Sequence, residues 1–246
     1  MDVVGDLLAR DRRSRDVALV TADGRERTYH DLITNAYKAA NVLRYLGARE
    51  GSTVAIEPTP RLHTTLAALG AAGLGAAVRF DTDAGIEAGD RVVLVDVADE
   101  PRTDPPPGTN LAAFGGPPDR PETTHWEQEL WSENPGMPPS DVGPDDPLVR
   151  GLGGDDDATH REVLAAAASV VDEHGVEAGT RVVLRTDFSD ARALAAGVVA
   201  PLSVGGTAVL ASQNGDGDGS RGAIAVADGD AIPPEPHTVS LASVPF

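Results

Sequence analysis

The sequence predicts an α/β fold in which parallel sheets are flanked by helices, and three observations support this prediction. A phrase of glycine, three residues, glycine and a β-branched run occurs three times, beginning at Gly47, Gly85 and Gly175. Two of these copies follow long amphipathic runs, which is typical of a helix that ends on a left-handed glycine before a tight turn and a buried strand. Short apolar strands also alternate with helices along the chain, as they do in parallel sheets covered by helices.

The composition fits a globular protein with an unusual charge. The 246 residues are enough for one large domain or two small ones. Lys and Arg number 20 against 39 Asp and Glu, which gives a formal net charge of −19, and Lys38 is the single lysine. Such a balance suits concentrated salt, where self-repulsion is screened, so we expect a halophilic protein. A basic partner is the alternative, but the acidity is spread along the chain rather than gathered in one tail, which favours salt.

Several classes of site and partner are excluded by the same composition. The chain has no cysteine, so it has no disulfide, thiolate nucleophile or zinc–thiolate site. Nucleic acid is not an expected partner, because few cations are present to replace the counterions of phosphates. No apolar run approaches the roughly 20 residues of a membrane span. The first residues lack the basic and apolar regions of a signal peptide, so we expect a cytoplasmic protein with no membrane contact.

Residues 1–98 are expected to form a first α/β unit. Val17–Val20 is a short strand, and Thr28 with an acidic Asp31 three residues later forms a capping box for a helix over 29–46. The apolar stripe of that helix consists of Leu32, Ala36, Ala39, Leu43 and Leu46. The further elements predicted in this unit are a strand at 54–56, a helix at 61–72 and strands at 76–80 and 91–97.

Residues 99–147 are rich in proline and are interpreted as a linker or irregular excursion. One short helix is predicted at 125–131, capped by Thr124 with Glu127. It carries Trp126 and Trp131, the only tryptophans of the chain. Two aromatic rings are able to form a ligand-stacking platform, but docking of an extended segment onto the domain is the favoured interpretation.

Residues 148–232 are expected to form a second α/β unit, and 233–246 a poorly covered tail. Thr159 and Glu162 form a second capping box. The buried face of the helix that follows is predicted to consist of Val163, Leu164, Ala167, Val170 and Val171. The later predictions are strands at 181–185, 207–210 and 223–227, a helix at 189–199 and a flexible acidic loop at 213–222.

Other constellations carry little chemistry. Residues 214–220 alternate oxygen-bearing side chains with glycine, as a calcium loop does, but the bidentate glutamate and flanking helices of such a loop are missing. A solvated acidic loop is therefore favoured there. None of the six histidines pairs at metal-ligand spacing, and His30 and His160 lie inside the two capping boxes. No catalytic residue and no metal ligand is nominated.

Parts of the chain resemble the acyl-adenylate-forming (AMP-binding) superfamily, which includes acyl-CoA synthetases, peptide-synthetase adenylation domains and luciferases. The resemblance covers about two-thirds of the chain. The segments that carry it are Ala18-Leu-Val, Thr28-Tyr-His-Asp-Leu32, Ala40-Asn-Val-Leu-Arg-Tyr-Leu-Gly47, Gly51-Ser-Thr-Val-Ala-Ile56, Leu66-Ala-Ala-Leu-Gly-Ala-Ala-Gly73, Asp146-Pro147 with His160, and Ala200-Pro-Leu-Ser-Val-Gly-Gly-Thr-Ala-Val-Leu210. The resemblance implies a shortened N-terminal lobe of that fold.

The chemistry that the resemblance implies is less well matched. Members carry a Ser/Thr/Gly-rich loop ending in Pro-Lys-Gly just before the helix that here begins at Thr159, and such a loop wraps phosphates. This chain has Arg150-Gly-Leu-Gly-Gly-Asp-Asp-Asp-Ala158 instead. The residues at the position of the phosphate loop are Gly151, Gly153, Gly154 and Thr159. Asp155, Asp156 and Asp157 are expected to repel a triphosphate, which a Mg²⁺ bridge would offset.

The later motifs of the superfamily are also missing from the sequence. There is no aromatic-Gly-x-Thr-Glu stretch for adenine and magnesium, and no C-terminal domain with its catalytic lysine. The leading hypothesis is therefore a truncated relative of acyl-CoA synthetases, a pseudoenzyme that binds a synthetase subunit or an acyl or nucleotide ligand. The alternative is a partial AMP-dependent ligase that activates a carboxylic acid with ATP and Mg²⁺ when another chain supplies the missing half. A third possibility is a decaying gene product, which would not fold cooperatively even in high salt. The strand end at 186–189 is a further place to look for a ligand.

Overall fold

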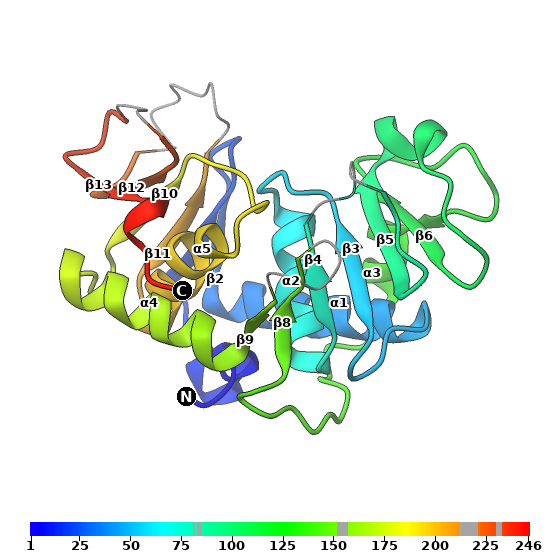
Figure 1. Cartoon of the computed structure of the whole chain (residues 1–246), viewed down its shortest axis with the longest axis horizontal. Helices are drawn as coiled ribbons and strands as arrows, with labels where there is room; N and C mark the ends of the chain where they lie inside the picture. Colours follow the sequence, from blue (N-terminus) through cyan, green and yellow to red (C-terminus); the bar gives the residue numbers. More distant parts are fainter. Residues whose placement is uncertain (81, 83–84, 152–156, 212–220, 230–232) are drawn as a thin grey trace. The chain divides into compact units, whose positions relative to one another are not determined.

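The computed structural model describes residues 1–80, 82, 85–151, 157–211, 221–229 and 233–246 (Figure 1). These residues form two compact units. Unit 1 consists of Met1–Ile33, Thr59–Leu62 and His160–Phe246, and unit 2 of Thr34–Pro58 and His63–Thr159. The chain therefore enters each unit more than once, which differs from the ranges 1–98, 99–147, 148–232 and 233–246 expected from the sequence.

Unit 1 is built on a six-stranded sheet. All of its neighbouring strands are parallel except the last pair, which is an antiparallel hairpin. Across the sheet the strands are β13 (His237–Ser240), β12 (Ile224–Ala227), β10 (Arg181–Leu184), β11 (Thr207–Leu210), β1 (Val17–Val20) and β2 (Glu26–Thr28).

Unit 2 is built on a seven-stranded sheet that likewise ends in an antiparallel hairpin. Its strands are β7 (Thr124–His125), β6 (Asn110–Phe114), β5 (Asp90–Asp96), β3 (Thr53–Ile56), β4 (Ala77–Arg79), β8 (Pro147–Val149) and β9 (Ala158–Thr159). The central strands β3 and β4 are buried along their whole length, as expected for parallel strands covered on both faces. The predicted α/β fold with parallel sheets and flanking helices is confirmed.

The helices follow the strands in a regular order. They are α1 (Tyr29–Tyr45), α2 (Leu62–Leu74), α3 (Trp126–Ser132), α4 (His160–His174), α5 (Ala191–Leu194) and α6 (Ala200–Ser203), with a π-helical stretch at Ala195–Val199 between the last two. The first residues of α1 belong to unit 1 and the remainder to unit 2. In unit 1, α4 packs on the run from α5 to α6 (Figure 1).

The first predicted capping box is formed at the start of α1. The Thr28 hydroxyl accepts from the N–H of Asp31 at 3.1 Å, and the Asp31 carboxylate accepts from the N–H of Thr28 at 3.2 Å. Tyr29 anchors this end within unit 1, because its buried hydroxyl donates to the carbonyl of Gly206 at 2.7 Å. Burial raises the pKa of Tyr29 to about 12, although the nearby Arg12 opposes the shift.

The glycine phrases end helices in the predicted way. Gly47 and Gly175 adopt φ angles of +100° and +63°. The N–H of the next residue donates to the carbonyl five residues earlier. These bonds run from Ala48 to Leu43 at 2.9 Å and from Val176 to Val171 at 3.1 Å. This pattern is the Schellman motif, and a left-handed glycine is the residue that fits it without strain.

The same order of elements occurs twice along the chain. The hairpin β1–β2 of unit 1 leads through α1 to the parallel strands β3, β4 and β5 of unit 2. The hairpin β8–β9 of unit 2 leads through α4 to the parallel strands β10, β11 and β12 of unit 1. The turns before β3 and β10 also form the same bond. The N–H of Gly51 donates to the carbonyl of Gly75 at 2.8 Å, and the N–H of Gly179 donates to the carbonyl of Gly205 at 3.0 Å. Each sheet is therefore completed by a hairpin that belongs to the other copy of the repeat.

Small residues allow close helix packing in unit 2. A Cβ atom at Gly70 of α2 would lie 2.8 Å from the backbone nitrogen of Ala40 and 3.0 Å from the carbonyl of Ala36, both in α1. Such distances are shorter than van der Waals contact, so the two helices touch through backbone at this point. The five predicted stripe residues of α1 are all buried.

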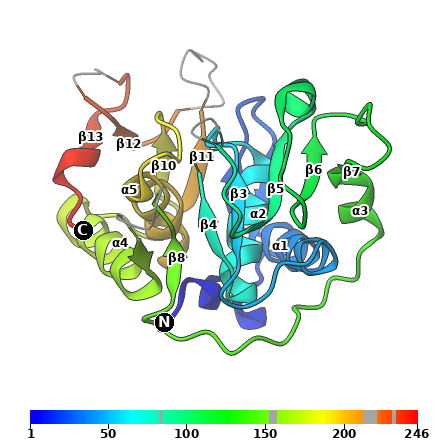
Figure 2. The same ribbon diagram turned by 45° about the vertical axis from the view of Figure 1, so that its right-hand side comes forward.

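The segment 99–147 differs from the expected linker. It contributes β6 and β7, which pair in parallel with β5 and with each other, and α3, which packs beside β6 (Figure 2). Strand pairing across a proline-rich sequence is a nonlocal effect that periodicity does not register. Helix α3 begins at Trp126 without a side-chain cap, so the predicted cap by Thr124 is wrong. Trp126 is fully buried, as the docking interpretation requires, whereas Trp131 is 86% exposed.

The segment 233–246 also differs from the expected tail. Strand β13 pairs in parallel with β12 over four residues, and a 3-10 turn at Leu241–Ser243 follows it. The predicted helix at 189–199 begins at Ala191 and continues to Ser203, with a π-helical stretch over Ala195–Val199. A Cβ atom at Gly197 would lie 2.7 Å from Leu184, so the glycine lets the helix approach β10. In α4, Leu164 and Val171 are half-buried rather than buried.

Within the described part of the chain, none of the helices combines the length and apolar character needed to cross a bilayer.

Candidate functional site

The carboxyl ends of the parallel strands are the first place to search in each unit. In open α/β sheets, ligands bind at the carboxyl ends of two neighbouring strands whose following connections lead to opposite sides of the strand order. In unit 2 this point lies between β3 and β5, and in unit 1 between β10 and β12. The residues that follow β3 and β10 are Glu57 and Arg185, and both N–H groups extend the sheet by donating to the neighbouring strand.

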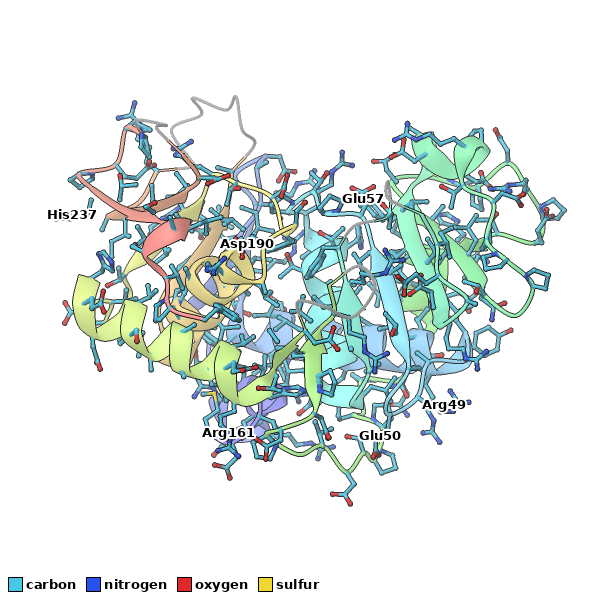
Figure 3. The ribbon with its side chains drawn as sticks, in the orientation of Figure 1. Arg49, Glu50, Glu57, Arg161, Asp190 and His237 are labelled. Atoms are coloured by element: carbon cyan, nitrogen blue, oxygen red, sulfur yellow. The ribbon has the colours of Figure 1, made fainter. Side chains whose placement is uncertain are left out.

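In unit 2 this point is closed by a carboxylate. Glu57 is 6% exposed and accepts from the N–H of Asp96 at 2.6 Å. The Asp96 carboxylate turns toward the next segment and accepts from the N–H of Ala98 at 2.9 Å. Figure 3 labels Glu57 at this end of β3 and Arg49 and Glu50 at the opposite end. The Glu57 carboxylate therefore holds the ends of β3 and β5 together instead of facing a ligand.

Elsewhere in unit 2, the Glu127 carboxylate lies between two imidazoles. Glu127 Oε1 lies 3.6 Å from His63 Nε2, and Glu127 Oε2 lies 3.5 Å from His125 Nε2. The Glu127 carboxylate also accepts from the N–H of Gly115 at 2.6 Å. It thus joins the ends of β6 and β7 to the start of α2 instead of capping α3. Across the described residues, no group of three or more His, Asp or Glu side chains is arranged to hold a metal ion.

In unit 1 the corresponding point is closed by an ion pair. The Arg185 guanidinium donates to the Glu235 carboxylate at 2.8 Å and 2.6 Å. This bidentate pair is nearly buried, with side-chain exposures of 12% and 1%. The predicted ligand region 186–189 follows directly. Its Asp187 accepts from the N–H of Ser189 at 2.9 Å, and Phe188 is fully buried.

The predicted phosphate loop joins β8 to β9 in unit 2. Of its nominated residues, the structure describes Gly151 and Thr159, and the latter lies in β9. Gly153 and Gly154 lie outside the described residues, as do Asp155 and Asp156. The possible calcium loop at 214–220 lies outside them too. The structure therefore brings together only the ends of the predicted loop.

Arg150 is a cation at this loop that the sequence alone did not single out. Arg150 Nη1 donates to the hydroxyl of Thr53 at 2.8 Å, and its Nη2 lies 3.4 Å from the carbonyl of Gly51. Its Nε lies 4.0 Å from the carboxylate of Asp157. The guanidinium is thus held by the body of unit 2 and by an acid of the same loop. A cation that directly follows a buried strand is the signal that would have found it.

Comparisons with known proteins give a structural likeness and no sequence match. No protein-family model and no curated protein sequence matches the chain. The anthranilate CoA ligase AuaEII in complex with anthranoyl-AMP is similar in structure, with a TM-score of 0.75 at 18% identity over 92% of this chain and 49% of that one. The N-terminal domain of FACL13 from Mycobacterium tuberculosis gives 0.74 at 23% identity over 93% and 63%. A benzoate CoA ligase from Burkholderia xenovorans gives 0.71 at 18% over 93% and 50%.

These likenesses establish the fold. The chain shares its fold with the N-terminal domain of FACL13 and with about half of each of the other two ligases. It spans about half the length of the ligases that it matches and somewhat more of the FACL13 domain. The expected fold is therefore confirmed.

Proposed function

We propose that this chain is an acyl-CoA synthetase-like protein that binds an acyl or nucleotide ligand and does not adenylate a carboxylic acid by itself. The observation that carries the proposal is the fold, which matches ligases over more than nine-tenths of the chain. One of these structures holds anthranoyl-AMP, which combines an acyl group and a nucleotide in one molecule.

The loop between β8 and β9 supports the absence of independent adenylation. Its sequence offers no lysine and places three consecutive aspartates before α4. Each unscreened contact between two unit charges at 4 Å costs about 1 kcal/mol in water, so these carboxylates oppose a triphosphate. The nearby Arg150 does not replace the lysine, because its guanidinium is already bonded to Thr53 and lies beside Asp157.

Concentrated salt is the proposed working medium. With a net charge of −19, the folded chain repels itself at low ionic strength. At about 1 M salt the Debye length falls to roughly 3 Å, which screens this repulsion. The ligand-binding assays are therefore designed in molar KCl.

The test combines binding with exchange. Thermal shifts would be measured with AMP, ATP, CoA and benzoyl-CoA, because a ligand that binds only the folded state raises its stability. Carboxylate-dependent ATP–pyrophosphate exchange would be measured on the same preparation with benzoate and anthranilate. We expect stabilisation by at least one ligand and no exchange.

Each contrary outcome has a defined meaning. Exchange by the chain alone would refute the non-adenylating role. Exchange that begins only when a second chain is added would support the alternative, an AMP-dependent ligase completed by a partner. An absence of any shift would refute ligand binding.

A further inference from the structure

Unit 1 contains a pocket whose lining shares no residue with the strand end at Arg185. Its volume is about 540 Å³. The residues that line it are Arg13, Ser14, Arg15, Thr28, His30 and Asp31. They come from the segment before β1, from the end of β2 and from the start of α1, and all of them belong to unit 1.

The backbone of this pocket is fixed by two hydrogen bonds. The N–H of His30 donates to the carbonyl of Ser14 at 3.1 Å, and the N–H of Tyr29 donates to the carbonyl of Asp16 at 3.0 Å. The segment 13–16 therefore runs beside the first turn of α1. Because these two helix N–H groups are already bonded, they are not donors for a ligand of the pocket.

The acidic side chains near the pocket are occupied. The Thr28 hydroxyl donates to the Asp31 carboxylate at 2.7 Å, and the Ser14 hydroxyl donates to the Asp16 carboxylate at 2.9 Å. The bond from Thr28 holds the pKa of Asp31 below its ordinary value against the effect of burial, with the positive charges of His30 and Arg27 adding to the shift. Asp31 is therefore a constant negative charge at one side of the pocket.

Two basic side chains of the lining, those of Arg15 and His30, are available to a ligand. Arg15 and His30 are exposed, and throughout the ranges that the structure describes neither side chain is engaged in a hydrogen bond or ion pair. Arg13 also belongs to the lining and has an interaction of its own within the fold. Arg15 and His30 thus offer donors to an anion, in a chain whose net charge is −19.

We propose that this pocket binds the phosphate group of a small phosphorylated ligand. Arg15 offers the planar, bidentate donor that matches a phosphate oxyanion, and the imidazole of His30 offers a second donor. The inference does not depend on the proposed binding of an acyl or nucleotide ligand elsewhere in the chain.

The test uses inorganic phosphate as the probe and isothermal titration calorimetry as the measurement. Arg15→Gln removes one charge and the bidentate donor, and we expect it to weaken phosphate binding by about tenfold. The matched control is Arg25→Gln, which removes the same charge at an exposed site where Arg25 pairs with Asp23 at 3.1 Å. We expect this control to change the affinity by less than about twofold.

A third variant is expected to strengthen phosphate binding instead of weakening it. Asp31→Asn removes the carboxylate of the lining, so phosphate binding should become tighter, and circular dichroism would show whether α1 is still formed. Equal weakening by Arg15→Gln and Arg25→Gln would mean that only net charge matters and would overturn the proposal. The absence of phosphate binding to the wild-type chain at tens of millimolar would overturn it as well.

Discussion

Arg79 Nη2 and Asp90 Oδ2 lie 2.5 Å apart, and both side chains are only 1% exposed. The arginine ends β4 and the aspartate begins β5, so the ion pair joins the two ends of the connection between these strands. The same guanidinium donates to the carbonyl of Gly85 at 3.0 Å, and the same carboxylate accepts from the N–H of Glu87 at 2.8 Å. One buried pair thus organises the described part of this connection.

Loss of one partner should destabilise the protein strongly. Asp90→Asn would leave the buried guanidinium of Arg79 without its counter-charge, which typically costs about 3–5 kcal/mol. Urea denaturation in molar KCl measures the change in the free energy of unfolding. The control is Asp99→Asn, whose partner Arg102 is 67% exposed, so the expected change is below about 1 kcal/mol. Similar small losses in both variants would contradict the assigned role.

A methyl group at Gly70 should not be tolerated. Gly70→Ala would place the new Cβ 2.8 Å from the backbone of Ala40, so α1 and α2 must move apart, at an expected cost of about 1–3 kcal/mol. The matched control is Gly89→Ala, where the added Cβ meets no atom within 4 Å. Thermal denaturation compares the two. Equal melting temperatures would show that the helices do not touch through backbone.

Glu100 should contribute to stability only above acidic pH. Burial acts to raise the pKa of this carboxyl, but the neighbouring Thr123 side chain and the hydrogen bonds from the N–H groups of Asp119 and Arg120 and from the Arg120 side chain outweigh it, so the pKa lies below its ordinary value. A lowered folded-state pKa gives stability that is present above the unfolded pKa of about 4.3 and is lost as the pH falls through the folded value. Glu100→Gln should therefore be less stable than the wild type at pH 7, and this difference should shrink below about pH 4.

The measurement for this prediction is the free energy of unfolding of both proteins across the same pH series. A difference that stays constant with pH would show that Glu100 acts through packing rather than through its charge.

Neutralising the acidic loop should strengthen nucleotide binding. Asp155→Asn, Asp156→Asn and Asp157→Asn together remove three charges, so the affinity for ATP should rise several-fold at low salt and by less in molar KCl. Equilibrium titration at two KCl concentrations measures both affinities. An unchanged affinity at low salt would show that the aspartates do not control access to the loop.

Stability should rise with salt. Because the chain carries a net charge of −19, raising KCl from about 0.1 M to about 2 M should increase the melting temperature. The matched comparison uses equal concentrations of a neutral osmolyte, which does not screen charge. A melting temperature that is flat or falls with KCl would refute the halophilic interpretation.

Where the signals are local, the sequence by itself determined a large part of this protein. Thr28 with Asp31 marks the start of α1, and Gly47 and Gly175 mark the ends of α1 and α4, because a cap or a left-handed turn involves only a few neighbouring residues. The alternation of such helices with buried strands was enough for the α/β fold, whereas particular segments such as Gly51-Ser-Thr-Val-Ala-Ile56 carried the resemblance to ligases.

Only the tertiary structure decided the contacts between distant residues. β6 and β13 join their sheets through backbone hydrogen bonds that any sequence can make, so their proline-rich surroundings gave no sign of them. The Arg185–Glu235 pair spans fifty residues, and the pocket joins the segment at Arg15 to the start of α1 across β1 and β2. Such partners are set by how the chain folds back on itself, which no local pattern of residues records.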